Sequence, residues 1–233
     1  MQFTRPIVSV ALATPRARIV RVDVRGLEFS FEPGQAIWIS AHGQTSRKPY
    51  SIASSPEDVA RDAELELLVG VDASGEAGPH LPLVPGTMLD IDGPLGRFTF
   101  PAEPAAQRFL FIAGGTGISP LRSMLRHSLN VRHVEIGLMY SARQPDEFAY
   151  AQELQAMAKA GTIELRMTVT RDVERTDWSG TRGRITRDDL APLVHDGRTL
   201  CFVCGPPALV NEMPKLLYQL GVKRDLVRTE QWG

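Results

Sequence analysis

The sequence predicts a two-domain protein in which an all-β N-terminal half precedes an α/β C-terminal half. Up to Phe100, short apolar runs recur about every ten residues, separated by turn residues and without helical periodicity. Pro101 and Pro104 then interrupt this pattern with a segment that favours extended backbone. Beyond them, apolar runs alternate with helical stretches, which is typical of a parallel sheet. We therefore expect one domain over residues 1–102 and a second over residues 103–233.

The first half contains four strong strand candidates. They are residues 19–24, 36–40, 65–71 and 88–91, and Pro-Gly turns precede the second and the fourth. Short strands at this spacing predict a small antiparallel barrel or sandwich.

The second half alternates strands with helices. Residues 109–113, 134–139, 164–169 and 200–203 are the expected buried strands, and residues 147–159 and 208–220 are the expected helices. Ser119 followed by Pro120 predicts the cap and first position of another helix.

Composition argues against several kinds of partner. Lys and Arg number 26 and Asp and Glu number 27, so the net charge of −1 gives no electrostatic reason to expect a nucleic acid or an anionic membrane. No apolar run could span a bilayer and residues 1–10 do not resemble a signal peptide, so we expect a cytoplasmic protein. Two cysteines are too few for a disulfide framework or an iron–sulfur cluster. We expect no metal site, and a redox centre would be an organic cofactor or belong to a partner.

A glycine-rich turn follows the strand at residues 109–113. It consists of Gly114, Gly115, Thr116 and Gly117, and it leads into the predicted helix. Small residues there allow backbone N–H groups and a helix N-terminus to approach the pyrophosphate of a dinucleotide. Turns of this kind also serve as plain tight connections, and Pro120 stands where the last glycine of the full dinucleotide signature would be.

A second motif, Arg47-Lys48-Pro49-Tyr50-Ser51-Ile52, lies in the β half. A flavin needs an aromatic or apolar face for its ring, a polar donor near the ring edge and a cation near its phosphates. Tyr50, Ser51 and the Arg47–Lys48 pair offer these groups within five residues. An ordinary strand with a basic start is the alternative interpretation.

Five landmarks in this order resemble the ferredoxin–NADP reductase superfamily over nearly the whole chain. They are Pro33-Gly34-Gln35, Tyr50-Ser51, Gly93-Pro94-Leu95-Gly96, the turn from Gly114 to Pro120, and Cys204-Gly205-Pro206-Pro207. The resemblance implies a Greek-key antiparallel β-barrel that binds FAD and a parallel-sheet α/β domain that binds NADPH or NADH.

The resemblance also implies roles for individual residues. Tyr50 would stack on the flavin ring, Ser51 would hydrogen-bond at flavin N5, and Cys204 would lie beside the nicotinamide, with Ser51, Cys204 and Glu230 as the catalytic set. Gly114, Gly115, Thr116 and Gly117 would hold the pyrophosphate of the nicotinamide dinucleotide. The other implied cofactor contacts are Arg47, Lys48, Pro49, Ile52, Val69, Val71, Gly75, Gly78, His80, Leu81, Pro120, Gly205, Pro206 and Pro207. Cys201 and Cys204 should point to opposite faces of their strand, so Cys201 is expected in the core.

Two departures from the family pattern concern the FAD phosphates. Lys48 stands where related flavoproteins have Arg, and a lysine lacks the bidentate fork of a guanidinium. Gly78 takes the place of a pyrophosphate-binding serine. Reversible flavin binding therefore stays open. We expect His80 to be a partly exposed loop residue and not a catalytic base.

The nucleotide preference depends on the adenosine end. Ser141 and Arg143 follow one strand, Thr170 and Arg171 follow the next, and Arg182 and Arg184 flank a glycine. Because cations and hydroxyls bind a 2′-phosphate, these residues favour NADPH, with NADH as the alternative. Near the C-terminus, Trp232 either gates the flavin or packs on the barrel.

Three functional hypotheses follow. The leading one is a flavoprotein reductase that passes electrons from NADPH or NADH to a ferredoxin, a flavodoxin or an oxygenase component. The second is a flavin reductase that uses FAD or FMN as a diffusible substrate. The third is an electron-transfer subunit of a larger complex.

Overall fold

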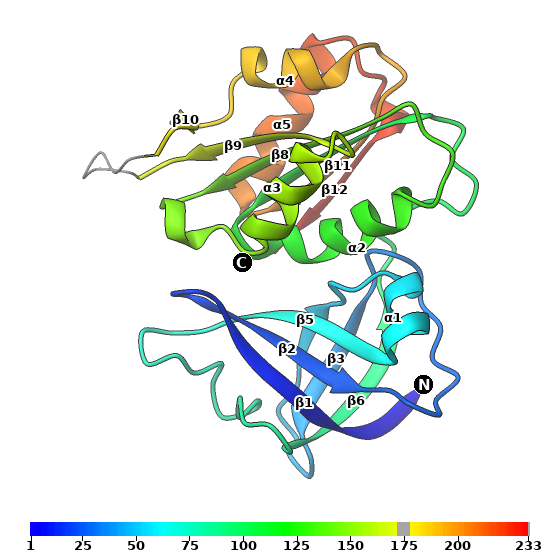
Figure 1. Cartoon of the computed structure of the whole chain (residues 1–233), viewed down its shortest axis with the longest axis vertical. Coiled ribbons are helices and arrows are strands. Elements are labelled where there is room, and N and C mark those ends of the chain that lie inside the picture. The colour runs from blue at the N-terminus through cyan, green and yellow to red at the C-terminus, as the bar shows by residue number, and fades with distance from the viewer. Residues whose placement is uncertain (172–177, 233) are drawn as a thin grey trace. The chain divides into compact units, whose positions relative to one another are not determined.

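The structure of the chain is a computed structural model that describes residues 1–171 and 178–232. It divides into two compact units, Met1–Phe100 with Arg122–His127, and Pro101–Leu121 with Ser128–Gly233 (Figure 1). The first unit is a barrel-like antiparallel sheet and the second is a parallel sheet with helices, which confirms the predicted fold class. The predicted boundary at residue 102 stays a prediction.

Six strands form the antiparallel sheet of the first unit. They are β1 (Gln2–Thr14), β2 (Ala17–Asp23), β3 (Ala36–Ala41), β4 (Lys48–Ser51), β5 (Glu64–Gly70) and β6 (Met88–Leu95), in the order β4-β3-β6-β1-β2-β5. A bridge between Ile52 and Leu67 joins the end of β4 to β5, so the two edge strands of the sheet meet and close it into a barrel. Alternate residues such as Val20, Ile37 and Leu67 fill its core.

A short helix in the barrel unit differs from the expectation that this half contains only strands. Helix α1 (Pro56–Asp62) begins with a capping box in which Ser55 and Asp58 satisfy each other's backbone N–H groups. Pro56 occupies the first turn, where its missing N–H costs nothing. A helix of under two turns is too short to show an apolar period, so these capping residues were its only sequence signal.

All strands of the second unit run parallel. They are β7 (Arg108–Gly114), β8 (Glu135–Ala142), β9 (Glu164–Val169), β10 (Thr181–Arg182), β11 (Leu200–Gly205) and β12 (Val227–Gln231), in the order β10-β9-β8-β7-β11-β12. The four strands predicted for this half are therefore confirmed within three residues at each end.

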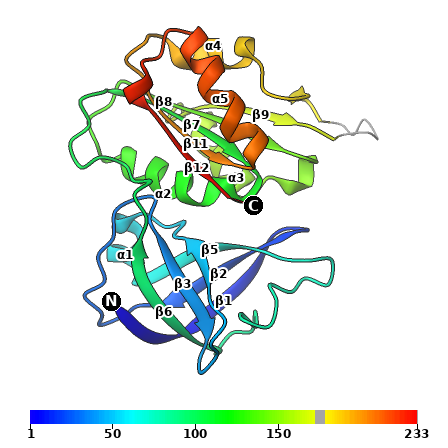
Figure 2. The same ribbon diagram turned by 180° about the vertical axis from the view of Figure 1, so that it is seen from behind.

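Helices cover both faces of the parallel sheet. Helices α4 (Arg187–Val194) and α5 (Pro207–Gln219) lie on one face, and α3 (Ala151–Lys159) lies on the other (Figures 1 and 2). Cys201 belongs to the core under α4 and α5, as predicted. The helix predicted to start at Ser119 starts one residue earlier, because a 3₁₀ turn at Gly115–Gly117 runs directly into α2 (Ile118–Ser128). Ser119 is therefore inside the helix and is not its cap.

The second half of α2 belongs to the first unit. Arg126 forms a short ion pair with Asp58 at 2.5 Å, and Ser123 donates to the carbonyl of Ser54 at 2.8 Å. Burial opposes ionisation of Asp58, but the hydrogen bonds from Arg126 and Ser55 outweigh it and hold the pKa of that carboxyl well below its ordinary range. Arg61 also pairs with Asp58, at 3.1 Å, so two guanidinium groups meet this carboxylate.

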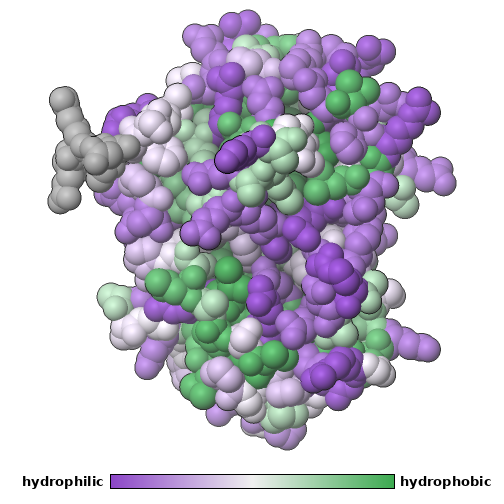
Figure 3. All heavy atoms as spheres, viewed as in Figure 1, coloured by the Kyte–Doolittle hydropathy of each residue, from purple (hydrophilic) through white to green (hydrophobic). Residues whose placement is uncertain are grey.

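Polar and apolar side chains are mixed on the surface drawn in Figure 3. Among the described residues, no helix combines the length and the apolar character needed to cross a membrane.

Candidate functional site

Two of the sequence landmarks meet because β7 and β11 are neighbouring strands. Ala113 of β7 is paired with Cys204 of β11, so the glycine turn (residues 114–117) and the segment from Cys204 to Pro207 leave the sheet side by side. A Cβ on Gly117 would lie 2.4 Å from the carbonyl oxygen of Cys204, and one on Gly205 would lie 3.0 Å from Gly114. Backbone therefore packs directly against backbone, and only glycine fits.

The outer part of the glycine turn is open to a ligand. Gly115 has φ +55, a Cβ there would meet nothing within 4 Å, and both Gly115 and Thr116 are exposed. The turn ends β7, whose neighbours β8 and β11 lie on opposite sides of it (Figure 2). Ligands of open α/β sheets bind at such a switch point, outside the carboxyl ends of the strands. The N-terminus of α2 adds a positive dipole end there.

The C-terminal strand brings an acid and an indole to the same sheet end. Glu230 is paired with Cys204 in register, and the Trp232 backbone N–H donates to the carbonyl of Gly205 at 3.1 Å. The indole N–H of Trp232 donates to the Glu230 carboxylate at 2.6 Å. Burial raises the pKa of Glu230 above its ordinary value, and this hydrogen bond partly opposes the rise.

Cys204 is fully buried in the structure. Burial, with a smaller contribution from the charge of Glu230, raises the pKa of its thiol well above the ordinary range. The side chain is therefore a neutral, weakly polar wall and not a thiolate nucleophile.

The residues predicted for the adenosine end gather at the ends of β8, β9 and β10. The backbone N–H groups of Thr170 and Arg171 donate to the carbonyls of Ala142 and Arg143, which holds the two strand ends together. Arg143, Arg171, Arg182 and Arg184 are all exposed, whereas Ser141 is buried. Four guanidinium groups at one sheet end form a cationic surface suited to a phosphate.

In the barrel unit, Tyr50 and His80 connect β4 to the loop between β5 and β6 (residues 71–87, the β5–β6 loop). A hydrogen bond of 2.7 Å joins the Tyr50 hydroxyl to Nε2 of His80. His80 is only 2% exposed, so the expectation of a partly exposed residue was wrong: the ring is enclosed where its loop folds over Tyr50. Burial lowers the pKa of His80, and the nearby charge of Lys48 lowers it further. Burial also raises the pKa of Tyr50 to about 12.

The two basic residues before Tyr50 have different surroundings. Arg47 pairs with Asp92 at 3.0 Å and lies over the Trp38 ring, 5.3 Å from its centroid. Lys48 is exposed and lies close enough to His80 to affect its pKa. Lys48 is therefore the better placed of the two to meet a phosphate beside Tyr50.

Some predicted contacts of the β5–β6 region have buried side chains. Val69, Ile52 and Leu81 belong to the barrel core and Val71 is 8% exposed, so these positions can offer only backbone groups to a cofactor. Gly75 has φ +85, and a Cβ there would lie 2.9 Å from the Arg18 guanidinium. The positive φ therefore accounts for this glycine without a ligand, and the flexible Arg18 side chain lies beside it.

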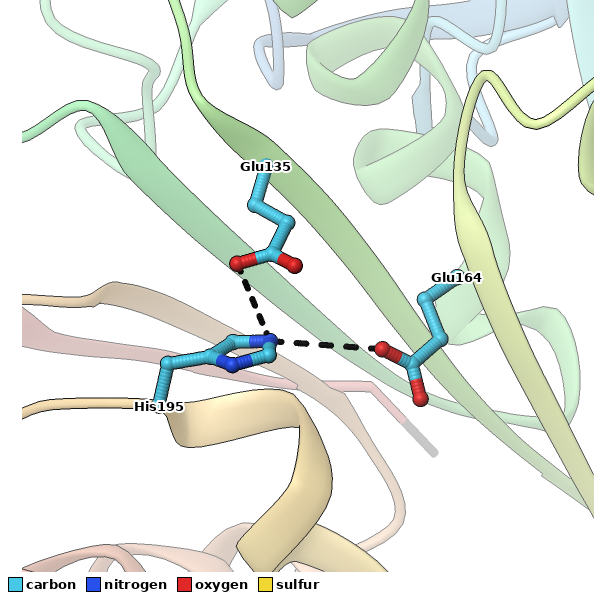
Figure 4. A group of neighbouring side chains, drawn as sticks. All are labelled: Glu135, Glu164 and His195. Carbon is cyan, nitrogen blue, oxygen red and sulfur yellow. Dashed lines mark ion pairs between the residues drawn. The ribbon is translucent and has the colours of Figure 1, made fainter.

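A separate charged cluster, drawn in Figure 4, lies away from these groups. His195 follows α4, with Nε2 at 3.1 Å from a Glu135 carboxylate oxygen and 4.0 Å from one of Glu164. Arg108 and Arg166 pair with the same two carboxylates. Glu135 and Glu164 begin β8 and β9, so the cluster marks the amino ends of the strands, opposite the glycine turn.

Comparison with known proteins identifies the family. Residues 7–100 match the family model of an oxidoreductase FAD-binding domain, and residues 111–215 match that of an oxidoreductase NAD-binding domain. The chain is 33% identical to ferredoxin–NADP reductase B of Sorangium cellulosum, covering 99% of this chain and 97% of that protein. The chain belongs to the ferredoxin–NADP reductase superfamily.

A further relative and two solved structures are similar to nearly the whole chain. The oxidoreductase NAD-binding domain-containing protein 1 of Danio rerio is 27% identical to this chain, and the match covers 99% of this chain and 92% of that protein. The ferredoxin reductase in carbazole 1,9a-dioxygenase has the same fold, with a TM-score of 0.84, 24% identity, and coverage of 100% of this chain and 70% of that one. A ferredoxin NADP⁺ reductase from Neisseria gonorrhoeae gives a TM-score of 0.81 at 18% identity, with coverage of 99% and 98%.

FAD and a nicotinamide dinucleotide are the cofactors of this oxidoreductase, and its residues fit both. Tyr50 offers a half-buried aromatic ring, Lys48 an exposed cation and Ser51 a buried hydroxyl on one strand. The open backbone at Gly115 fits a pyrophosphate. At Gly78, φ is +106, so a serine could not adopt this loop conformation without strain. Lys48 and the loop backbone are therefore the groups of this region that could meet a phosphate.

Sequence reasoning missed two groups that shape the site. Arg18 fills the space beside Gly75, but nothing in the sequence connects residues so far apart. Tyr140 donates a hydrogen bond to the carbonyl of Gly115. Its place three residues before Arg143, on the strand next to the glycine turn, was the available signal.

Proposed function

We propose that this reductase takes a hydride from NADPH onto FAD and passes the electrons to a separate acceptor, such as a ferredoxin, a flavodoxin or an oxygenase component. The observation that carries the proposal is that the glycine turn, Cys204 and Glu230 occupy one end of the parallel sheet. Bound FAD supplies the chemistry of accepting a hydride and releasing electrons one at a time.

In the barrel unit, the proposed role of Tyr50 is to support the flavin ring. Its hydrogen bond to His80 restrains the phenol, and Lys48 offers the phosphates a cation on the same strand. Ser51 is the proposed hydrogen-bonding group at flavin N5, with Pro49 and Ile52 holding the strand around it. Gly75, Gly78 and Leu81 give the β5–β6 loop its path.

In the α/β unit, the glycine turn is the proposed pyrophosphate site. Cys204, as a neutral thiol, forms a wall that excludes water from the nicotinamide, and Gly205, Pro206 and Pro207 extend that wall. Glu230 orients Trp232 by accepting its indole N–H, which supports the proposal that this ring covers the nucleotide site. Pro120 lies in the first turn of α2, where it needs no donor.

NADPH is the proposed donor. The support is the group of exposed arginines, Arg143, Arg171, Arg182 and Arg184, beside Ser141 and Thr170 at the carboxyl ends of β8 to β10. A 2′-phosphate carries a charge that NADH lacks, and guanidinium groups bind phosphates through paired N–H donors.

The acceptor is proposed to be a one-electron protein. The support is that the relatives are named a ferredoxin–NADP reductase and a ferredoxin reductase in a dioxygenase system.

Anaerobic titration of the purified protein tests the proposal. Yellow protein whose flavin absorbance bleaches with one equivalent of NADPH, and then reduces a ferredoxin or a one-electron dye, would support it. Flavin absorbance that bleaches with neither NADPH nor NADH would contradict it. We expect the Kd for NADPH to be at least about tenfold lower than the Kd for NADH. This ratio corresponds to roughly 1.4 kcal/mol, which one charged contact can supply.

A flavin reductase with diffusible FAD or FMN is the second candidate. Gly78 and Lys48 favour it, because both replace groups that hold FAD phosphates more firmly in related proteins. Colourless purified protein that oxidises NADPH only when free flavin is added would select this function over the first.

A further inference from the structure

Tyr140 is a buried tyrosine on β8 that lies next to the glycine turn. Its side chain is fully enclosed, and its hydroxyl donates to the carbonyl oxygen of Gly115 at 3.0 Å. The same hydroxyl oxygen accepts the backbone N–H of Ala149 at 3.2 Å. Burial raises the pKa of this phenol well above its ordinary range, so the hydroxyl keeps its proton and remains a donor.

The hydrogen bond determines the orientation of one peptide in the turn. The carbonyl of Gly115 also accepts the backbone N–H of Ile118, so two donors draw it toward the protein. Because a trans peptide is planar, the N–H of Thr116 points opposite to the carbonyl of Gly115. Gly115 and Thr116 are both exposed, so this N–H is directed away from the phenol, on the open side of the turn.

The phenol also restrains the segment that leads away from the adenosine end. Ala149 follows Phe148, whose ring lies edge-on to Tyr140 with 5.0 Å between centroids. The ring of Trp178 stacks on the ring of Phe148, with 5.2 Å between their centroids. One hydroxyl thus connects the glycine turn to the chain that follows Ser141 and Arg143.

We propose that Tyr140 is a positioning residue for the nicotinamide dinucleotide, whose hydroxyl presets the Gly115–Thr116 peptide to donate to the pyrophosphate. The inference rests on the proposed role of the glycine turn as the pyrophosphate site. Tyr140 does not touch the reacting atoms, since it is fully buried. Loss of the hydroxyl therefore weakens nucleotide binding and leaves the chemical step intact.

The test is Tyr140→Phe in the full-length holoenzyme, with KM and kcat for NADPH and the Kd for NADP⁺ from calorimetry. We expect KM and Kd to rise about tenfold, the size of effect that loss of one hydrogen bond produces, while kcat stays within about twofold. Flavin content should match that of the wild type, because the barrel residues are unchanged.

Two control variants separate positioning from stability. Tyr218→Phe removes a hydroxyl from a partly buried tyrosine on α5 and should leave KM unchanged. Ile136→Val removes a methylene from a buried residue at the other end of β8, so it lowers stability without reaching the turn. A Tyr140→Phe protein that melts earlier, like Ile136→Val, but binds NADP⁺ as tightly as the wild type would overturn the proposal.

Hydrogen exchange on the wild type supplies a measurement that needs no variant. NADP⁺ should slow exchange of the Thr116 amide, and an amide whose exchange does not change at saturating NADP⁺ would overturn the proposal. Failure of the proposed function has a different signature: the wild type would then bind neither NADP⁺ nor NAD⁺, whatever the state of Tyr140.

Discussion

The glycine turn of the α/β unit and the β5–β6 loop of the barrel unit are both proposed to hold phosphates, but they are built differently. At the turn, Gly114, Gly117 and Gly205 press backbone against backbone, with a Cβ on Gly117 excluded by the carbonyl of Cys204. In the β5–β6 loop, hydrogen bonds hold the path: one joins Tyr50 and His80, and others run between backbone groups and to the Asp72 carboxylate, while Gly78 adopts a positive φ. Close backbone packing restricts the turn at Gly117 and Gly205, whereas the loop is held by hydrogen bonds that single substitutions can remove.

This contrast has a functional consequence. With the proposed roles, the nucleotide would meet a backbone site fixed by packing, and the flavin would meet a loop whose hydrogen bonds single substitutions can change. We therefore expect substitutions in the turn to cause large losses of kcat/KM for NADPH, and substitutions in the loop to cause smaller, graded changes in the Kd for FAD.

Gly117→Ala should give the largest effect. Its Cβ would overlap the Cys204 carbonyl, and overpacking of this kind costs about 1–3 kcal/mol. We expect kcat/KM for NADPH to fall by about 100-fold, which corresponds to roughly 2.7 kcal/mol. Steady-state kinetics on protein with full flavin content measures it. Gly70→Ala is the control for loss of a glycine, because φ at Gly70 is not in the left-handed region and a Cβ there would meet nothing within 4 Å. Equal losses of kcat/KM in both variants would contradict the proposed difference between the turn and the loop.

Gly78→Ser should weaken FAD binding, although related proteins use a serine there. At φ +106 a side chain is strained by about 1–2 kcal/mol, so we expect the Kd for FAD to rise by about tenfold. Fluorescence titration of the apoprotein with FAD gives the value. Tighter FAD binding in the variant would contradict this expectation. It would mean that the loop rearranges so that the serine contacts FAD.

Lys48→Gln and Arg47→Gln form a matched pair. Because Arg47 is engaged with Asp92 and Trp38, removing its charge should change the Kd for FAD by less than about twofold. Removing the charge of Lys48 should raise that Kd by about fivefold, as expected for one exposed charge–phosphate contact. Flavin titration at two salt concentrations measures both. A larger effect from Arg47 would reverse the assignment of the phosphate cation.

His80 predicts a small pH dependence of stability. Its pKa in the folded protein lies below the ordinary value of 6.5, so the folded state binds the proton less tightly than the unfolded state. The stability that neutral His80 contributes is present above about pH 6.5 and is lost as pH falls through the lowered folded pKa. We expect the melting temperature to drop by a few degrees between about pH 7.5 and pH 5.5. In His80→Gln the drop in melting temperature should be smaller. The same drop in the variant as in the wild type would show that His80 does not cause the pH dependence.

The amino-acid order alone was enough to predict the two fold classes, eight of the twelve described strands and the glycine turn, because turn residues and apolar periods are local signals. It also indicated Tyr50, Lys48 and Cys204 as functional candidates, since short motifs carry them. It missed α1, because its only signal was the cap at Ser55.

Tertiary structure decided which of these residues face one another. Pairing of β7, β11 and β12 brings Gly117, Cys204 and Glu230 together from three distant segments, and folding of the β5–β6 loop buries His80 against Tyr50. Tyr140 reaches Gly115 only because β8 lies beside β7. Such contacts depend on strand order and side-chain packing over long sequence separations, which no local pattern encodes.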